Sequence, residues 1–134
     1  LPTAVEGLPL RHVLEVRNAS FLNEEFLALV RRRGVALVGT DSETYPSFFD
    51  TSGALVYLRL MRARSEEPTG YPADELDAWQ RRAAAWARGD EPGDLPCIGP
   101  APATAAARPV HVLFIDGAKE RAPMAALALT ERLA

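Results

Sequence analysis

The sequence predicts an α/β protein in which a parallel sheet of about four strands is covered by helices. Two observations carry this prediction. Four short runs read as strands, and three of them are almost continuously apolar, which is typical of strands buried on both faces of a parallel sheet. Helical patterns alternate with these runs along the chain, as in β-α units. The runs are residues 11–17, 35–38, 54–60 and 110–115.

The first strand and first helix have clear signals. Residues 11–17 alternate, so that Glu15 and Arg17 share one face. Residues 21–33 predict a helix whose N-cap is Ser20 or Asn23, because both side chains can accept a bond from a free backbone N–H. The glycine at position 34 suits the residue that ends this helix.

The second half of the chain holds the clearest helix. It covers residues 73–88, where Leu76, Trp79, Ala83 and Trp86 recur at spacings of three and four. The repeated spacing indicates that both tryptophans face a core. The last strand, residues 110–115, precedes a final helix over residues 124–133, and Pro123 suits its first turn.

The segment between the second helix and the last strand predicts a flexible connection. Residues 89–109 contain five prolines, three glycines and many alanines. The rest of the chain reads as one domain over residues 1–134.

Composition limits the possible partners. The chain is 48% hydrophobic and 25% charged, with a net charge of −3, which makes a dedicated nucleic-acid binder unlikely. The basic run Arg31–Arg33 fits the solvated end of a helix, although it could also face phosphate. No apolar run approaches the roughly 20 residues of a membrane span. The single cysteine, Cys97, excludes an internal disulfide and fits a reducing cytoplasm.

Charged side chains near the ends of the strands predict the site, because parallel sheets bind ligands at the carboxyl edge of their strands. We assign one side of each strand by alternation, and each set turns polar towards its end. The sets are Val13, Glu15 and Arg17; Val35, Leu37, Gly39 and Asp41; Leu55, Tyr57, Arg59 and Met61; and Val110, Val112, Phe114 and Asp116.

Six of these residues form the candidate site: Glu15, Arg17, Asp41, Tyr57, Arg59 and Asp116. The arginines suit phosphate or carboxylate groups, and the acids suit sugar hydroxyls or acid–base catalysis. Lys119 lies before the last helix, whose N-terminus can attract an anion. His12 and His111 fall on the opposite, helix-facing side. No histidine or cysteine spacing supports a metal site, and no cofactor motif is present.

Three interpretations of these charges stay open. In the first, Arg17 and Arg59 bind a small polar or anionic metabolite while Glu15 or Asp116 exchanges a proton and Asp41 orients. In the second, the same arginines form a non-catalytic module that binds a ligand or nucleic-acid phosphate. In the third, the charges form an ion-pair network that is purely structural.

Several short motifs give a resemblance to a known family. Residues 14–21 read LEVRNASF, residues 26–38 read FLALVRRRGVALV and residues 56–60 read VYLRL, followed by residues 114–123. In this order they resemble the C-terminal half of the YecE-like family, a domain of unknown function designated DUF 72. The resemblance covers nearly the whole chain from about Leu8.

The resemblance implies a (β/α)8 TIM barrel of about twice this length. The four strands would then be half of a barrel, and the other half, from the same parent chain or another subunit, would supply further site residues. Met61 and Arg62 replace a histidine and a glycine that are common in the family, and Ile115-Asp116-Gly117 differs from the usual end of the last strand. Family members have been likened to sugar isomerases, so a sugar or sugar phosphate is the implied ligand class.

Overall fold

The computed structural model describes residues 1–134 and contains a four-stranded parallel sheet. Its strands are β3 (Val13–Leu14), β4 (Ala36–Asp41), β5 (Val56–Leu60) and β6 (Val110–Phe114), in the spatial order β3-β4-β5-β6. Each strand thus pairs with the next one along the chain. A doubly wound sheet reverses its strand order, whereas a barrel does not. The sheet is therefore consistent with half of a (β/α)8 barrel.

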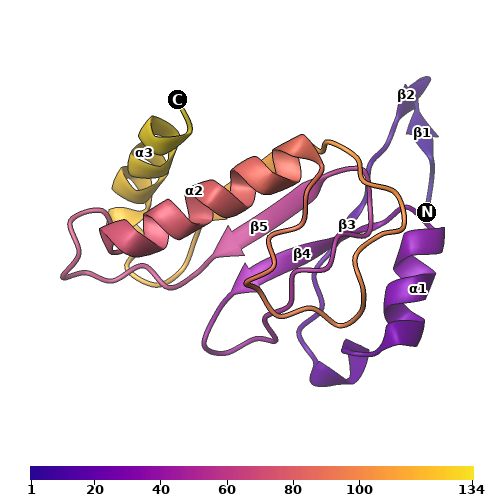
Figure 1. Ribbon diagram of the computed structural model, residues 1–134, viewed down its shortest axis with the longest axis horizontal. Helices are drawn as coiled ribbons and strands as arrows, with labels where there is room; N and C mark the ends of the chain where they lie inside the picture. The colour runs from indigo at the N-terminus through magenta and orange to yellow at the C-terminus, as the bar shows by residue number, and fades with distance from the viewer.

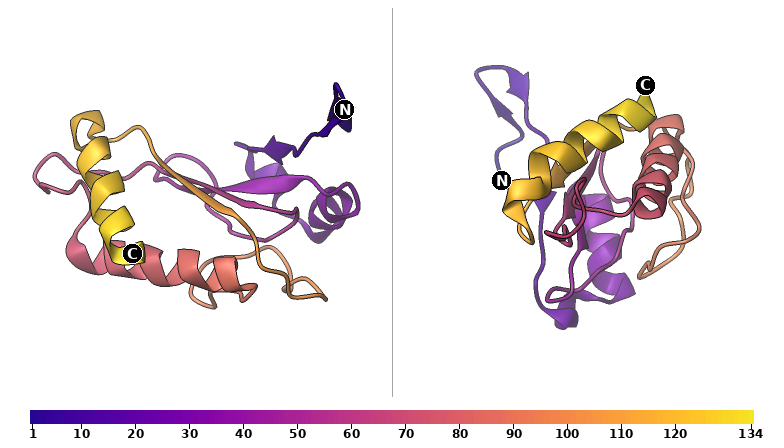
Figure 2. Two further views of the ribbon diagram at one scale, coloured as in Figure 1. Left: turned by 90° about the horizontal axis from the view of Figure 1, so that it is seen from above. Right: turned by 90° about the vertical axis from the view of Figure 1, so that its left-hand side faces the viewer.

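Three helices accompany the strands. The chain forms α1 (Glu24–Arg32) after β3, α2 (Ala73–Arg88) after β5 and α3 (Ala122–Leu133) after β6. Figures 1 and 2 show α2 and α3 packed over one face of the sheet, while α1 lies at the end of the sheet away from α3. The connection from β4 to β5 contains no helix. The opposite face of the sheet carries no helix, and this face would be the interior of a barrel.

The predicted helices and strands are confirmed, with shifts at their ends. The second helix spans residues 73–88 as predicted, and Gly89 closes it with φ of 93°. The first helix begins at Glu24, because the Asn23 side chain accepts the N–H of Phe26. A short 3₁₀ helix, Ala19–Phe21, precedes it. The first strand is only two residues long, since the chain leaves the sheet after Leu14.

A small N-terminal hairpin was not predicted. Strands β1 (Ala4–Val5) and β2 (Leu8–Pro9) pair antiparallel and project from the body of the protein (Figure 1). Glu6 and Gly7 form the turn with φ of 49° and 79°. The pairing is too short to give the alternation that predicts a strand. A second 3₁₀ helix, Lys119–Arg121, precedes α3.

The core consists of two clusters that lie on different parts of the sheet. The larger packs β5 against α2 and α3 and includes Phe49, Leu58 and Trp86. The smaller packs α1 against β3 and β4 and includes Leu27 and Phe48. Two consecutive phenylalanines therefore belong to different clusters.

The connection over residues 89–109 has no helix or strand but is tied to the body. The buried carboxylate of Asp50 accepts the backbone N–H groups of Ile98 at 2.7 Å and Gly99 at 3.0 Å. Ile98 also packs against the smaller core cluster. We call residues 98–108 the strap. None of the helices is long and apolar enough to cross a lipid bilayer.

Candidate functional site

The open face of the sheet carries the first part of the site. Strand register decides which side chains share a face, because residues paired in a parallel sheet point the same way. Arg59 pairs with Thr40, Tyr57 pairs with Val38, and Val13 pairs with Ala36. Leu58, between Tyr57 and Arg59, is buried on the helix side with 2% exposure. Tyr57 and Arg59 therefore face the open side, as predicted.

Glu15 links two arginines on this open side. Its Oε1 atom accepts Nε–H of Arg17 at 3.3 Å, and its Oε2 atom accepts a short bond from Nη1 of Arg59. The side chains of Glu15 and Arg59 are each 20% exposed, whereas Arg17 is 51% exposed. One carboxylate thus holds two guanidinium groups, which leaves a local charge of +1. We call these three residues the Arg–Glu–Arg cluster.

Tyr45 completes the cluster and was not found from the sequence. The Arg17 guanidinium lies over the Tyr45 ring, 4.4 Å from its centre, and Nη1 donates to the Tyr45 hydroxyl at 3.2 Å. A cation over an aromatic face is attracted by the ring quadrupole, so the ring fixes the position of the arginine. Tyr45 is in a loop without periodicity, where nothing in the sequence indicates which way a side chain points.

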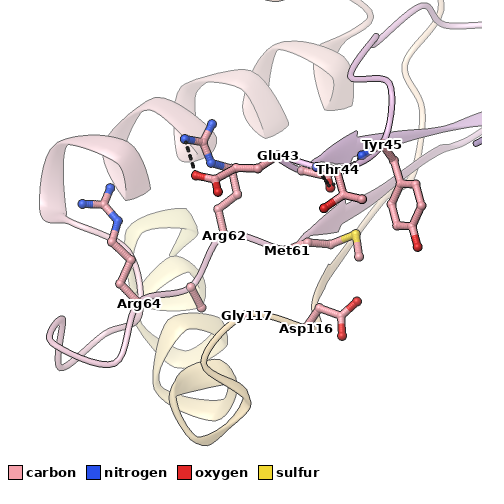
Figure 3. A pocket seen from close by; sticks show the side chains of 10 residues that line it. Glu43, Thr44, Tyr45, Met61, Arg62, Arg64, Asp116 and Gly117 are labelled. Atoms are coloured by element: carbon pink, nitrogen blue, oxygen red, sulfur yellow. Dashed lines mark hydrogen bonds and ion pairs between the residues drawn. The ribbon is translucent and has the colours of Figure 1, made fainter. Parts of the chain in front are cut away.

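An open cleft of about 730 Å³ lies beside the cluster at the carboxyl edge. Figure 3 shows Tyr45, Met61 and Asp116 on one side of this cleft and Arg62 and Arg64 on the other. The residues that line it come from the ends of β4, β5 and β6: Ser42, Glu43, Thr44, Tyr45, Met61, Arg62, Ala63, Arg64, Asp116 and Gly117. Most of the lining is polar. Met61 and Arg62, which replace the histidine and glycine common in the resembling family, are both part of it.

Asp116 and Lys119 lie at this edge without a close partner. The Asp116 side chain is 53% exposed and borders the cleft, and its nearest cation is Nζ of Lys119 at 4.0 Å. The backbone of Asp116 has φ of 58°, in the left-handed region. This turn takes the carboxylate out of the regular alternation of β6. Its position beside the cleft could therefore not follow from alternation alone.

Asp41 does not join the Arg–Glu–Arg cluster. It pairs with Leu60 across β4 and β5, so it lies on the helix side of the sheet. There its Oδ2 atom accepts the hydroxyl of buried Tyr71 at 3.0 Å, and its Oδ1 atom is 3.7 Å from Arg62. Burial raises the pKa of Asp41 above its ordinary value of 3.8, although the bond from Tyr71 and the charge of Arg62 oppose this.

The predicted side of the sheet was wrong for the residues of two strands, β4 and β6. In β4, Gly39 pairs with Leu58 and therefore faces the helices. In β6, Val112 pairs with Leu58 and packs into the larger core cluster, as do Val110 and Phe114. In β4 the polar residues Thr40 and Asp41 are adjacent and therefore face opposite sides, and Asp116, which gave the predicted side of β6, lies beyond the end of that strand.

The corrected side of β6 changes the position of His111 most clearly. It pairs with Tyr57 and lies on the open face, not on the helix side. The two rings are 6.1 Å apart between centres. His12 instead bonds to the backbone oxygen of Pro2 at 2.7 Å. No group of three or more histidine, cysteine, aspartate or glutamate side chains is placed to hold a metal ion.

The fold and the charged residues at the carboxyl edge of the sheet together indicate the class of protein. Strands in consecutive parallel order, with charged residues gathered where the strands end, are features of a (β/α)-barrel protein. The chain belongs to the family described as Protein of unknown function DUF72, whose match extends over residues 1–134. A comparison with curated proteins and with solved structures returned no match.

Proposed function

We propose that this protein binds a small anionic metabolite, of the sugar phosphate class, at the carboxyl edge of its sheet. The observation that carries the proposal is the Arg–Glu–Arg cluster. Two guanidinium groups converge on one carboxylate and retain N–H donors that no protein atom accepts. Nη2 of Arg17 and both Nε and Nη2 of Arg59 make no protein hydrogen bond. Such paired donors match the oxygens of a phosphate or carboxylate.

The two acids have different roles in this proposal. Both oxygens of Glu15 already accept from arginines, so this side chain positions the guanidinium groups. Asp116 borders the cleft with only a distant lysine beside it, so its carboxylate is free to exchange a proton with a hydroxyl of the ligand. Lys119 adds positive charge at the same edge. Asp41 would act from the helix side, by holding Arg62 at the cleft rim.

The unpaired edges of the sheet and its exposed open face also support a further set of strands as a partner. β3 and β6 are the two edges of the sheet, and each has only one strand neighbour. On the open face, Val13 of β3 is 41% exposed, and His111 of β6, at the other edge of the sheet, is also exposed. Strands that pair with these edges would cover the interior and enclose the Arg–Glu–Arg cluster. We therefore expect the ligand site to be complete only in the closed barrel.

Arg17→Ala in the full-length protein tests the proposed function. Thermal unfolding is measured with ribose 5-phosphate, glucose 6-phosphate and the two neutral sugars, and Arg33→Ala serves as a control on the exposed end of α1. We expect a sugar phosphate to raise the melting temperature of the wild type and of Arg33→Ala, but not of Arg17→Ala. Unliganded Arg17→Ala should lose less than about 1 kcal/mol, because Glu15 keeps Arg59 as its partner.

Two outcomes would contradict the proposal. If Arg17→Ala responds to the sugar phosphates as the wild type does, the cluster does not hold the anion. If no compound raises the melting temperature and unliganded Arg17→Ala loses several kcal/mol, the cluster is a structural ion-pair network.

A further inference from the structure

A second group of arginines lies at the opposite, amino edge of the sheet. Arg31 is in the last turn of α1, before β4, while Thr51 and Ser52 precede β5 and Arg108 precedes β6. In a parallel sheet, segments that precede the strands meet at one edge. Together with the strap they enclose a cleft of about 570 Å³. Its lining is Arg31, Thr51, Ser52, Pro100, Ala101, Pro102, Ala103, Thr104 and Arg108.

Both arginines are fixed by backbone oxygens. Nε and Nη2 of Arg31 donate to the carbonyls of Thr51 at 3.1 Å and Pro100 at 2.9 Å. Nε and Nη1 of Arg108 donate to the carbonyls of Gly53 at 3.1 Å and Ala106 at 3.0 Å. The Arg108 side chain is only 8% exposed. Four carbonyl contacts therefore orient the two guanidinium groups and tie the strap to the sheet.

The positive charge of this cleft is not balanced. A carbonyl accepts a hydrogen bond but carries no net charge, and no carboxylate is part of the lining. The nearest acid is Glu91, whose Oε1 atom is 4.0 Å from Nη1 of Arg108 and already accepts the hydroxyl of Thr51 at 2.5 Å. Arg31 has no ion pair. Only one of the two guanidinium groups thus has a carboxylate within 4.0 Å.

Both arginines also keep free donors on accessible atoms. Nη1 of Arg31 and Nη2 of Arg108 make no hydrogen bond with the protein. Among the fully buried side-chain nitrogen and oxygen atoms, only Trp86 Nε1 lacks a hydrogen-bond partner. The two free arginine nitrogens are therefore not fully buried and are in contact with solvent. Since both residues line the cleft, their free N–H groups are available to a ligand there.

We propose that this amino-edge cleft is an oxyanion site that takes a phosphate group, either as free phosphate or as part of a small phosphorylated molecule. Forked N–H donors fixed in advance by carbonyls are suited to phosphate oxygens, because binding then costs little ordering of side chains. The hydroxyl of Thr104 is a further donor in the lining. This site is separate from the Arg–Glu–Arg cluster, which lies where the strands end.

Ala103→Glu tests the site without removing any of its arginine contacts. Ala103 lines the cleft and is exposed, so a glutamate there brings a competing carboxylate to Arg31 and Arg108. Ala105→Glu adds the same charge to an exposed strap residue outside the lining. Binding of inorganic phosphate and of glycerol 3-phosphate to the full-length protein is measured by calorimetry at constant ionic strength. Amide hydrogen exchange locates the protected segment.

We expect both anions to slow exchange in the strap of the wild type, of Ala105→Glu and of Arg17→Ala. Ala103→Glu should lower the affinity by about tenfold or more. Tighter binding of inorganic phosphate would identify the free ion as the ligand of this cleft. Tighter binding of glycerol 3-phosphate would identify a small phosphorylated molecule instead. Arg31→Gln should give the same loss, and if it does not fold, Ala103→Glu still decides. The proposal is overturned if neither anion protects the strap, or if Ala103→Glu binds as tightly as Ala105→Glu. Loss of protection in Arg17→Ala would assign the anion to the carboxyl edge instead.

Discussion

The two edges of the sheet hold arginines in two different ways. At the carboxyl edge, Arg17 and Arg59 share the carboxylate of Glu15, and Arg17 stays half exposed. At the amino edge, Arg31 and Arg108 are held by backbone carbonyls. A carboxylate both orients a guanidinium group and removes most of its charge, whereas a carbonyl only orients it. Hydrogen bonding and charge balance are therefore separate properties of a site.

The largest expected effect is at the amino edge, where Asp50 holds the strap. Asp50→Ala leaves the backbone N–H groups of Ile98 and Gly99 without their acceptor, and each loss costs about 1–3 kcal/mol. We expect about 3 kcal/mol lower stability in urea unfolding. Asp90→Ala, which removes a carboxylate from an exposed ion pair, should change it by less than about 0.5 kcal/mol. Equal effects of the two variants would show that the strap is not held by Asp50.

A smaller effect is expected at the carboxyl edge. Glu15→Gln keeps the shape of the side chain but leaves two guanidinium groups facing each other without their carboxylate. Because Arg59 and Glu15 are mostly buried, we expect a loss of about 2 kcal/mol in urea unfolding. Glu43→Gln, at a glutamate that is 81% exposed, is the control and should be nearly neutral. A neutral Glu15→Gln would mean that neither arginine depends on the charge of Glu15.

The smallest change is in how the free energy of unfolding depends on pH, and it comes from the carboxyl group of Asp41. Because burial raises its pKa in the folded protein, Asp41 binds a proton more readily when folded than when unfolded. The stability that this group contributes is therefore fully present below pH 3.8 and is lost as the pH rises through the raised value. We expect the stability of wild type relative to Asp41→Asn to fall from pH 3.5 to pH 7, as measured by urea unfolding. A flat or rising difference would contradict the raised pKa.

Alternation predicted the correct side of the sheet for two pairs of polar residues, each pair two positions apart in the sequence. Glu15 and Arg17 lie on the open face as predicted, and so do Tyr57 and Arg59. The relative phase of neighbouring strands depends on register, which is set by packing and not by the sequence of either strand. In β6 the side was predicted from Asp116, which lies beyond the end of the strand, so His111 was placed on the wrong face. The boundaries of the 73–88 helix were predicted because its apolar periodicity agrees with Gly89 at its C-terminal end.

Residues outside the strands could not be found in this way. Tyr45 and Tyr71 reach the two faces of the sheet from loops, and Arg108 acts through a strap with no periodicity. Composition predicted a flexible connection over residues 89–109, and these residues contain no helix or strand. It gave no sign that Asp50, 48 residues away from Ile98, would accept two N–H groups of that segment. Such contacts depend on the folded path of the chain.

The consecutive phenylalanines of the two core clusters have a consequence for how the chain unfolds. Phe48 and Phe49 are joined by one peptide bond, yet each is buried in a different cluster. Neither cluster can open without moving the backbone that anchors the other. The segment that leads into the strap adds a second mechanical link, since Leu95 packs on one cluster and Ile98 on the other. Loss of one cluster is therefore expected to melt both, so that the whole sheet unfolds in a single cooperative step.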